Sequence, residues 1–303
     1  MSDVETSRGL SRIARPGGGL AMVAIDQRES LRTMIQRTTA DPVGDEAVVQ
    51  FKVAIADILA PYASGMLFDA DFGYPALDAA RLRNPACGLI VSTDKLVQER
   101  GGPVTDTYFD TELDLGTLRS RGVVALKCLI LWRGTENDDR CVEQAASFMA
   151  TCRREGLLGI VEAMVQMPSE LNTATWDRNE AIVDAARALA SSQPDLYKAD
   201  VPTAGLGPDG EITAWSERVT AVIGGPWVVL SAGVAIEDFP RAVGAACRGG
   251  ASGFLAGRAV WADAIGESYR TDLETTAGPR LRRLVEIVDS EARPWTQAIS
   301  VSA

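Results

Sequence analysis

The stretch GVVALKCLILW at residues 122–132 is followed by TENDDRCVEQAASFMATCRREG at 135–156 and by GLLGIVEAMV at 156–165. The first and third segments are apolar runs typical of buried strands. The middle segment has apolar residues at three- and four-residue spacing, which is typical of an amphipathic helix. A strand, a crossover helix and a second strand form the repeating unit of a parallel sheet, so this stretch predicts an α/β fold.

The same alternation extends over most of the chain. Apolar runs typical of strands occur eight times, at 20–26, 65–71, 87–93, 122–132, 156–165, 195–201, 227–233 and 253–257. Amphipathic segments lie between several of them, at 45–62, 135–156, 175–192, 209–225 and 235–250. Eight strands with helical crossovers predict a closed (β/α)8 TIM barrel, because an open doubly wound sheet usually has fewer strands and a Gly-rich nucleotide loop.

The barrel pattern also sets expectations for the rest of the chain. We expect one domain over 1–303, with the barrel core at about 18–290 and short extensions at both ends. The long, polar segment at 94–121 predicts a small extra element, and the tail from about residue 290 is expected to be peripheral. No Gly-rich nucleotide motif follows a strand, so no cofactor is expected.

Composition excludes several classes of function. The chain has 41 acidic and 30 basic residues and a net charge of -11, so nucleic acids and membrane surfaces are not expected partners. It contains no histidine, which excludes Ser-His-Asp and Cys-His hydrolases, and no metal site is expected. No apolar segment is long enough for a signal or a membrane span, so a cytoplasmic location is expected. The five cysteines form no C-x-x-C pair and are expected to be reduced core residues.

Polar side chains late in the predicted strands indicate where the active site lies, because barrel enzymes carry catalytic groups at the C-terminal ends of their strands. These residues are Asp26, Gln27, Arg28, Glu29, Asp69, Asp71, Lys127, Glu162, Lys198, Asp200, Ser231, Gly233, Gly257 and Arg258. Among them, Lys127 and Lys198 stand out, since lysine is rarely tolerated in a buried strand. One such lysine is as well explained by a structural ion pair, but two together with Asp26 and Glu162 favour an active site.

A lysine near another cation in a desolvated site has a lowered pKa, which provides the free amine that attacks a carbonyl to form an imine. This chemistry is that of a class I aldolase, and it needs no metal. The segments with Ser231, Gly233, Gly257 and Arg258 end strands seven and eight, where barrels usually bind phosphate. The alternatives are turn geometry for Ser231 and the glycines and a surface salt bridge for Arg258.

The segments LAMVAIDQRESLR (20–32), ALKCLILWR (125–133), DLYKADVP (195–202), VVLSAGV (228–234) and GASGFLAGRAVW (250–261) resemble one bacterial family. This family includes tagatose 1,6-bisphosphate aldolase and sulfofructosephosphate aldolase, and the resemblance is closer to the latter. It implies an imine on Lys198, dihydroxyacetone phosphate as product, and Lys127, Glu162 and Asp26 around the scissile bond. It also implies phosphate binding by the segments with Ser231, Gly233, Gly257 and Arg258, and substrate contacts from Gln27, Arg28 and Asp69. Arg28 is the candidate for binding the distal sulfonate or phosphate.

The chain departs from the family pattern at two places. Gln166 stands where the sulfofructosephosphate enzymes tend to have arginine, and Asp71 adds a negative charge after the second strand. The resemblance therefore predicts an aldolase more firmly than it predicts one substrate. The expected substrate is 6-deoxy-6-sulfofructose 1-phosphate, cleaved to dihydroxyacetone phosphate and sulfolactaldehyde, and the alternative is tagatose or fructose 1,6-bisphosphate.

Other functions stay open from sequence alone. A sugar-phosphate isomerase or decarboxylase would share the barrel and the phosphate loops without needing Lys198 as a nucleophile. A non-catalytic sugar-phosphate sensor would keep the pocket and lose the chemistry. For each of these functions the partner is a small sugar phosphate, and the resemblance implies a homo-oligomer.

Overall fold

The computed structural model describes residues 9–98, 104–172 and 174–298. Eight parallel strands close into a barrel in the order β1-β10-β9-β8-β7-β6-β3-β2. The strands are β1 (Leu20–Ile25), β2 (Gly65–Phe68), β3 (Gly88–Ser92), β6 (Val123–Trp132), β7 (Leu158–Val165), β8 (Leu196–Asp200), β9 (Trp227–Leu230) and β10 (Gly253–Ala256). The prediction of a (β/α)8 TIM barrel is confirmed, and each strand lies within one of the eight apolar runs.

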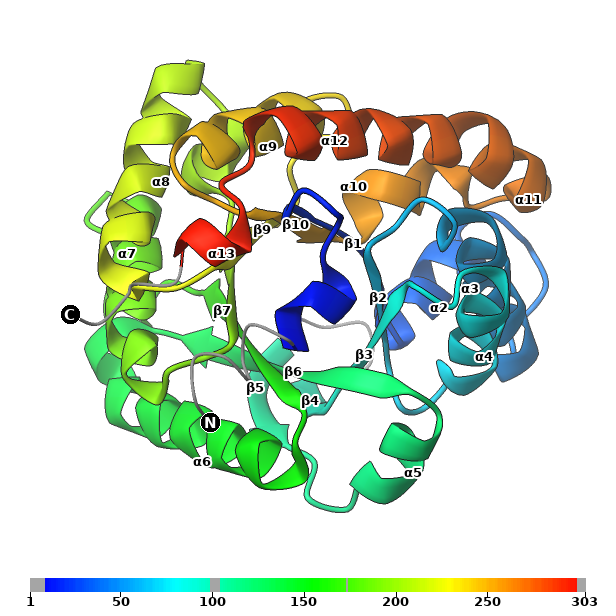
Figure 1. Ribbon diagram of the computed structural model, residues 1–303, viewed down its shortest axis with the longest axis horizontal. Helices are drawn as coiled ribbons and strands as arrows, with labels where there is room; N and C mark the ends of the chain where they lie inside the picture. The colour runs from blue at the N-terminus through cyan, green and yellow to red at the C-terminus, as the bar shows by residue number, and fades with distance from the viewer. Residues whose placement is uncertain (1–8, 99–103, 173, 299–303) are drawn as a thin grey trace.

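Helices form a ring outside the barrel (Figure 1). The longer ones are α2 (Glu29–Gln36), α3 (Asp45–Leu59), α4 (Tyr74–Arg83), α6 (Asp138–Glu155), α7 (Arg178–Leu189), α8 (Asp209–Ile223), α9 (Phe239–Arg248) and α12 (Gly278–Glu291). Shorter ones are α5 (Leu115–Ser120), α10 (Arg258–Trp261), α11 (Tyr269–Asp272) and α13 (Trp295–Ala298). The five amphipathic segments predicted as crossover helices correspond to α3, α6, α7, α8 and α9. None of the helices in the described ranges is long and apolar enough to cross a membrane.

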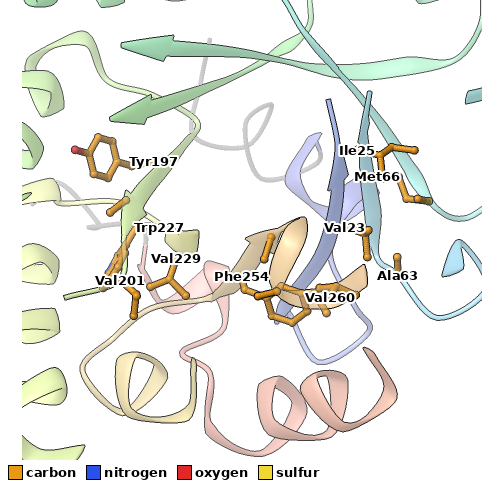
Figure 2. Packing of buried hydrophobic residues seen from close by; sticks show 14 of the residues in the cluster. Val23, Ile25, Ala63, Met66, Tyr197, Val201, Trp227, Val229, Phe254 and Val260 are labelled. Carbon is orange, nitrogen blue, oxygen red and sulfur yellow. The ribbon is translucent and has the colours of Figure 1, made fainter. Parts of the chain in front are cut away.

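Alternate residues of each strand face two different environments, as the period of a β-strand requires. One set packs against the helices, and Figure 2 shows Val23, Ile25, Met66, Val229 and Phe254 in this layer. The other set fills the barrel interior with apolar side chains. These include Met22, Ala24, Leu67, Ile90, Ala125, Ile160, Leu196, Val228 and Leu255. All five cysteines are buried and free, as expected of reduced core residues.

Both terminal segments cover one end of the barrel (Figure 1). Leu10, Ile13 and Trp295 belong to the same apolar cluster as the interior residues of the strands, and Trp295 is only 6% exposed. The Trp295 backbone N–H donates to Gly18 O at 3.0 Å, which ties the tail to the segment before β1. The prediction of a peripheral tail is therefore wrong for this part. An open barrel end exposes apolar side chains, and α13 covers them with one large aromatic side chain.

The segment at 94–121 contains the small extra element that its length predicts. β4 (Asp94–Gln98) pairs antiparallel with β5 (Val104–Phe109), and α5 follows. The Thr107 hydroxyl donates to Leu129 O at 2.7 Å, so the hairpin is fixed to the C-terminal half of β6. This places β4 and β5 beside the barrel mouth.

The end cover can be tested with Trp295→Ala. Because Trp295 is buried among interior residues, the variant should lose about 3 kcal/mol of unfolding free energy, as large-to-small core changes do. Urea unfolding followed by circular dichroism measures the difference. Gln297→Ala changes an exposed residue of the same helix and should be nearly neutral. A loss of less than about 1 kcal/mol for Trp295→Ala would show that the cover is not part of the core.

Candidate active site

Two lysines and a glutamate from three neighbouring strands meet at the C-terminal end of the barrel interior. Glu162 of β7 lies directly opposite Lys198 of β8 in the strand register. Its Oε1 is 2.9 Å from Lys198 Nζ and its Oε2 is 3.1 Å from Lys127 Nζ of β6. The three residues are buried, at 2% exposed for Lys127, 4% for Lys198 and 6% for Glu162. One carboxylate thus bridges two amines in a site nearly free of solvent.

Lys127 has two further carboxylate partners. Its Nζ is 2.8 Å from Asp26 Oδ2 and 2.9 Å from Asp94 Oδ1. Burial alone would lower the pKa of Lys127, but Asp26, Asp94 and Glu162 outweigh it and raise this pKa well above 10.5. Burial would likewise raise the pKa of Asp26, but Lys127 and Lys198 outweigh it and lower this pKa below 3.8. Lys127 and Asp26 therefore both stay charged at neutral pH.

Asp94 belongs to this cluster and was missed from sequence. Its Oδ1 also accepts from Ser92 Oγ at 2.8 Å and from the Leu129 backbone N–H at 3.1 Å. Asp94 follows the apolar run at 87–93 directly, just as Asp26 ends the run at 20–26. The rule that located Asp26 would have located Asp94 as well.

Asp69 directly follows β2, as the strand pattern predicts, but its carboxylate is engaged by another residue of the protein. It is fully buried and forms an ion pair with Lys52 of α3, which is also fully buried. Lys52 Nζ donates to Ile25 O at 2.6 Å and to Gln27 O at 2.8 Å. Asp69 Oδ2 accepts from the Phe72 backbone N–H at 2.6 Å. Both oxygens of Asp69 are occupied, so the expected contact with substrate has no support in this geometry, and the pair instead fixes the end of β1.

Lys52 gave a signal that sequence reasoning did not use. Val48, Lys52, Ile55 and Leu59 share one face of α3, and all four are buried. A lysine on the apolar face of a helix requires a buried partner, because an uncompensated charge there is costly. The partner, Asp69, lies on another element, and its position cannot be obtained from the helix pattern.

Gln27 and Arg28 follow β1 at the barrel mouth. Gln27 Oε1 is buried and has no hydrogen-bond partner among the residues that the structure describes. A Cβ at Gly257 would lie 2.9 Å from Gln27 Nε2, so the amide is packed against the end of β10. Arg28 donates from Nη1 to Asp94 O at 2.9 Å. Arg28 therefore lies beside Asp94 of the lysine cluster and Gln27 lies beside the end of β10, and contact of either side chain with substrate stays a prediction.

The four residues expected at the phosphate are brought together by the adjacent strands β9 and β10. Ser231 is buried, and it is followed by Ala232 at φ +44° and Gly233 at φ +87°. A left-handed alanine is a strained conformation of the kind that occurs at ligand sites. Gly257 has no room for a side chain, because a Cβ there would lie 2.6 Å from Ala24 O. Arg258 is exposed, and within the described ranges no hydrogen bond or ion pair holds its side chain.

Asp200 ends β8 two residues after Lys198. It is 1% exposed and accepts from Arg178 Nη2 of α7 at 2.7 Å. Burial raises the pKa of Asp200 to about 6, against the opposing effect of Arg178. The strand pattern noted Asp200 without assigning it a role, and Arg178, the first residue of α7, was missed. Their ion pair joins the start of α7 to the end of β8, the strand that carries Lys198.

A buried lysine amine beside a bridging carboxylate, at the mouth of a (β/α)8 barrel with loops suited to phosphate, defines an enzyme of the class I aldolase type. The comparison with known proteins gives the same class and identifies its family. The chain belongs to the DeoC/LacD family aldolases, whose profile matches residues 20–263. It is therefore a carbon-carbon lyase.

Individual relatives agree with the family. The chain is similar to tagatose 1,6-diphosphate aldolase 2 of Streptococcus mutans, with 24% identity over 96% of this chain and 97% of that one. It is 28% identical to tagatose 1,6-diphosphate aldolase of Listeria monocytogenes, over 95% and 92% of the two chains. An archaeal fructose 1,6-bisphosphate aldolase has the same fold, with a TM-score of 0.62 and 18% identity over 94% of this chain and 99% of that one. Closeness to sulfofructosephosphate aldolase stays a prediction.

The assignment of Asp69 to the Lys52 ion pair can be tested by stability. Asp69→Asn leaves a buried ammonium without its counter-charge and should lower the free energy of unfolding by about 3 kcal/mol. The double variant Lys52→Met, Asp69→Asn removes both charges and should recover at least half of this loss in urea unfolding. If Asp69→Asn instead left the free energy of unfolding unchanged and raised KM, Asp69 would be a substrate-binding residue.

The environment of Asp200 predicts a pH-dependent stability. Its folded-state pKa of about 6 lies above its ordinary value of 3.8, so the folded protein binds more protons than the unfolded chain between these values. The stability that Asp200 contributes is therefore greatest below about pH 4 and decreases as pH rises through about 6. Asp200→Asn removes this titration.

As pH rises from 4 to 7, the free energy of unfolding of the variant should increase by about 2 kcal/mol relative to that of the wild type. Loss of the Arg178 contact adds only an offset that does not change with pH. Urea unfolding across this range measures the slope, and Asp41→Asn, in an exposed turn, is the control. Equal slopes for Asp200→Asn and the wild type would contradict a raised pKa.

Proposed function

We propose that the chain cleaves a ketose 1-phosphate to dihydroxyacetone phosphate and a three-carbon aldehyde through an imine on Lys198. The observation that carries this proposal is Glu162 between the two lysines, 2.9 Å from Lys198 Nζ. An imine requires a neutral amine and a group that can take the ammonium proton, and Glu162 lies at hydrogen-bond distance from this proton. The family to which the chain belongs supports the class of reaction.

The first half of the reaction forms the imine. Lys198 gives a proton to Glu162, and its lone pair attacks the ketone carbon of the substrate. The resulting carbinolamine loses its hydroxyl as water when Lys127 or Glu162 supplies a proton. Lys127 is suited to assist at this step, because three carboxylates fix its ammonium beside Lys198 and Glu162.

The second half breaks the carbon-carbon bond. Glu162 takes the proton from the hydroxyl on the aldehyde side. The carbon-carbon bond then breaks, and the electron pair of this bond moves into the iminium to give an enamine. The aldehyde leaves, the enamine is protonated, and water releases dihydroxyacetone phosphate from Lys198. The proton-transfer roles of Glu162 and Lys127 can be exchanged, because Glu162 contacts both lysines and can pass a proton to either.

The phosphate on C1 is assigned to the ends of β9 and β10. The strained turn at Ala232 and Gly233 supports this assignment, as does the guanidinium of Arg258, which has no partner among the described residues. An arginine gives phosphate two parallel charge-assisted hydrogen bonds. Since β9 lies next to β8 in the barrel, a phosphate here places the ketone carbon near Lys198.

The far end of the substrate separates the finer candidates. The resemblance favours 6-deoxy-6-sulfofructose 1-phosphate, with sulfolactaldehyde as second product, and the tagatose relatives support the alternative of a 1,6-bisphosphate. All of these ketoses carry phosphate on C1, and our proposal is limited to this shared feature of the substrate. A homo-oligomeric state and a cytoplasmic location stay predictions.

Reduction with borohydride in the presence of dihydroxyacetone phosphate tests the imine. We expect a reduced three-carbon adduct on the peptide that contains Lys198, located by mass spectrometry after digestion. The exposed Lys95 is an internal control, because it should stay unmodified. Lys198→Arg keeps the charge but cannot form an imine, so it should lose the adduct and at least about 1,000-fold in kcat.

Other functions give different results in this experiment. An isomerase or decarboxylase would turn over substrate with Lys198→Arg and form no adduct. A sensor would be thermally stabilised by sugar phosphates without turnover. Either pattern would rule out the aldolase proposed for this site.

A further inference from the structure

A groove of about 370 Å³ opens beside the lysine cluster. It begins at Ser92 and Asp94, and Asp94 contacts Lys127 directly. The residues that line the groove follow β1, β2 and β3 or lie in the segment 94–113. In the barrel order β3 lies four positions from β9, whereas β1 is the neighbour of β10, so the groove extends from beside β10 to the side of the mouth opposite β9. A ketose bound through its C1 phosphate, with its ketone at Lys198, extends its far end toward this groove.

Arg28 is the cation in the groove that an anionic far end would need, and it already has a counter-ion. Its Nε is 3.0 Å from Asp71 Oδ2, and its Nη1 donates to Asp94 O. The Asp71 side chain is 61% exposed and lies on the open side of the groove, whereas the Arg28 side chain is only 13% exposed. An incoming anion therefore approaches Arg28 past a carboxylate.

The second cation of the groove is also paired. Lys95 Nζ is 3.0 Å from Asp110 Oδ1. Arg28 and Lys95 are the two basic residues that line the groove in the described part of the chain, against four acidic ones. The acidic residues are Glu29, Asp71, Asp94 and Asp110. Glu29 also pairs with Arg32, and Asp94 pairs with Lys127, so the exposed carboxylate that an anion meets at Arg28 is Asp71.

Arg133 does not change this balance. It lies at the end of β6, where its Nη2 donates to Thr105 O and to Gln166 Oε1, both at 2.7 Å. Gln166 in turn donates to Val104 O at 3.1 Å. Arg133 and Gln166 thus fix β5 of the hairpin, and Arg133 does not line the groove.

We infer that the preferred substrate is a ketose 1-phosphate whose far end is uncharged, and that Asp71 is the residue that determines this specificity. The aldehyde product is then uncharged too. The inference rests on the proposed function and deepens it. A hydroxyl-bearing end can hydrogen-bond to the carboxylates of the groove, whereas a sulfonate or phosphate is repelled by them. This repulsion disfavours both 6-deoxy-6-sulfofructose 1-phosphate and the 1,6-bisphosphates as substrates.

Aldol condensation tests the inference, because it compares two aldehydes that differ only in the phosphate on C3. Purified enzyme is given dihydroxyacetone phosphate with either D-glyceraldehyde or D-glyceraldehyde 3-phosphate, and kcat/KM for each aldehyde is taken from dihydroxyacetone phosphate consumption. The wild type should favour glyceraldehyde by about tenfold. In Asp71→Asn the ratio should shift toward the phosphorylated aldehyde by about tenfold, since one repulsive charge is removed and Arg28 is released.

Asp45→Asn is the matched control. Asp45 is an exposed carboxylate paired with Arg32 outside the groove, so this variant changes net charge equally and should keep the wild-type ratio. Added salt should raise the relative use of the phosphorylated aldehyde by the wild type and have less effect on Asp71→Asn, because the repulsion lies at an exposed carboxylate.

The outcomes separate the two proposals. If borohydride traps no adduct at Lys198, the aldolase proposal fails. If the adduct forms but the wild type prefers glyceraldehyde 3-phosphate, or Asp71→Asn leaves the ratio unchanged, the inference about the far end is overturned while the aldolase remains. Sulfolactaldehyde as the preferred aldehyde would also overturn it and would support the sulfosugar instead.

Discussion

The ammonium of Lys127 lies in the interior of the barrel and is held by carboxylates that reach it from three other strand ends. Asp26 follows β1, Asp94 follows β3 and Glu162 belongs to β7, and each lies within 3.1 Å of Lys127 Nζ. A lone charge at this depth would cost several kcal/mol, so the carboxylates must be present and ionised for Lys127 to be tolerated. The same contacts fix Glu162 in the orientation that meets Lys198, so the catalytic geometry depends on this one buried cation.

The barrel makes this arrangement possible by separating apolar from charged layers along its axis. Ala125, Ile160 and Leu196 fill the interior one step below Lys127, Glu162 and Lys198 on the same three strands. Because side chains alternate with a period of two, the residues two positions after these apolar interior residues point into the same space. The apolar layer keeps water out from below, and the low polarity strengthens each ion pair above it.

Sequence predicted those features that depend on one segment at a time. The strand pattern located Lys127, Glu162, Lys198 and Asp26, since each interrupts or ends an apolar run, and the structure brings these four together. It did not predict the features that depend on two distant segments. In the sequence, Asp69 resembles Asp26, because both are carboxylates near the end of a strand. In the structure, however, Asp69 forms an ion pair with Lys52, which belongs to a different element, α3. The cover formed by Trp295 was missed for a similar reason, because a four-residue helix is too short to show periodicity.

Pairing between charges also distinguishes the two arginines at the mouth. Arg258 and Arg28 both follow a strand and both resemble anion-binding residues of the family, yet Arg258 has no partner within the described ranges and Arg28 lies between Asp71 and Asp94 O. A motif records that an arginine is present, but its affinity for an anion depends on which charges already surround it. In the site that we propose, Arg258 is therefore available to an anion, whereas Arg28 already has a counter-ion. Two enzymes can share the imine chemistry and the C1 phosphate site and still differ in substrate through one exposed carboxylate.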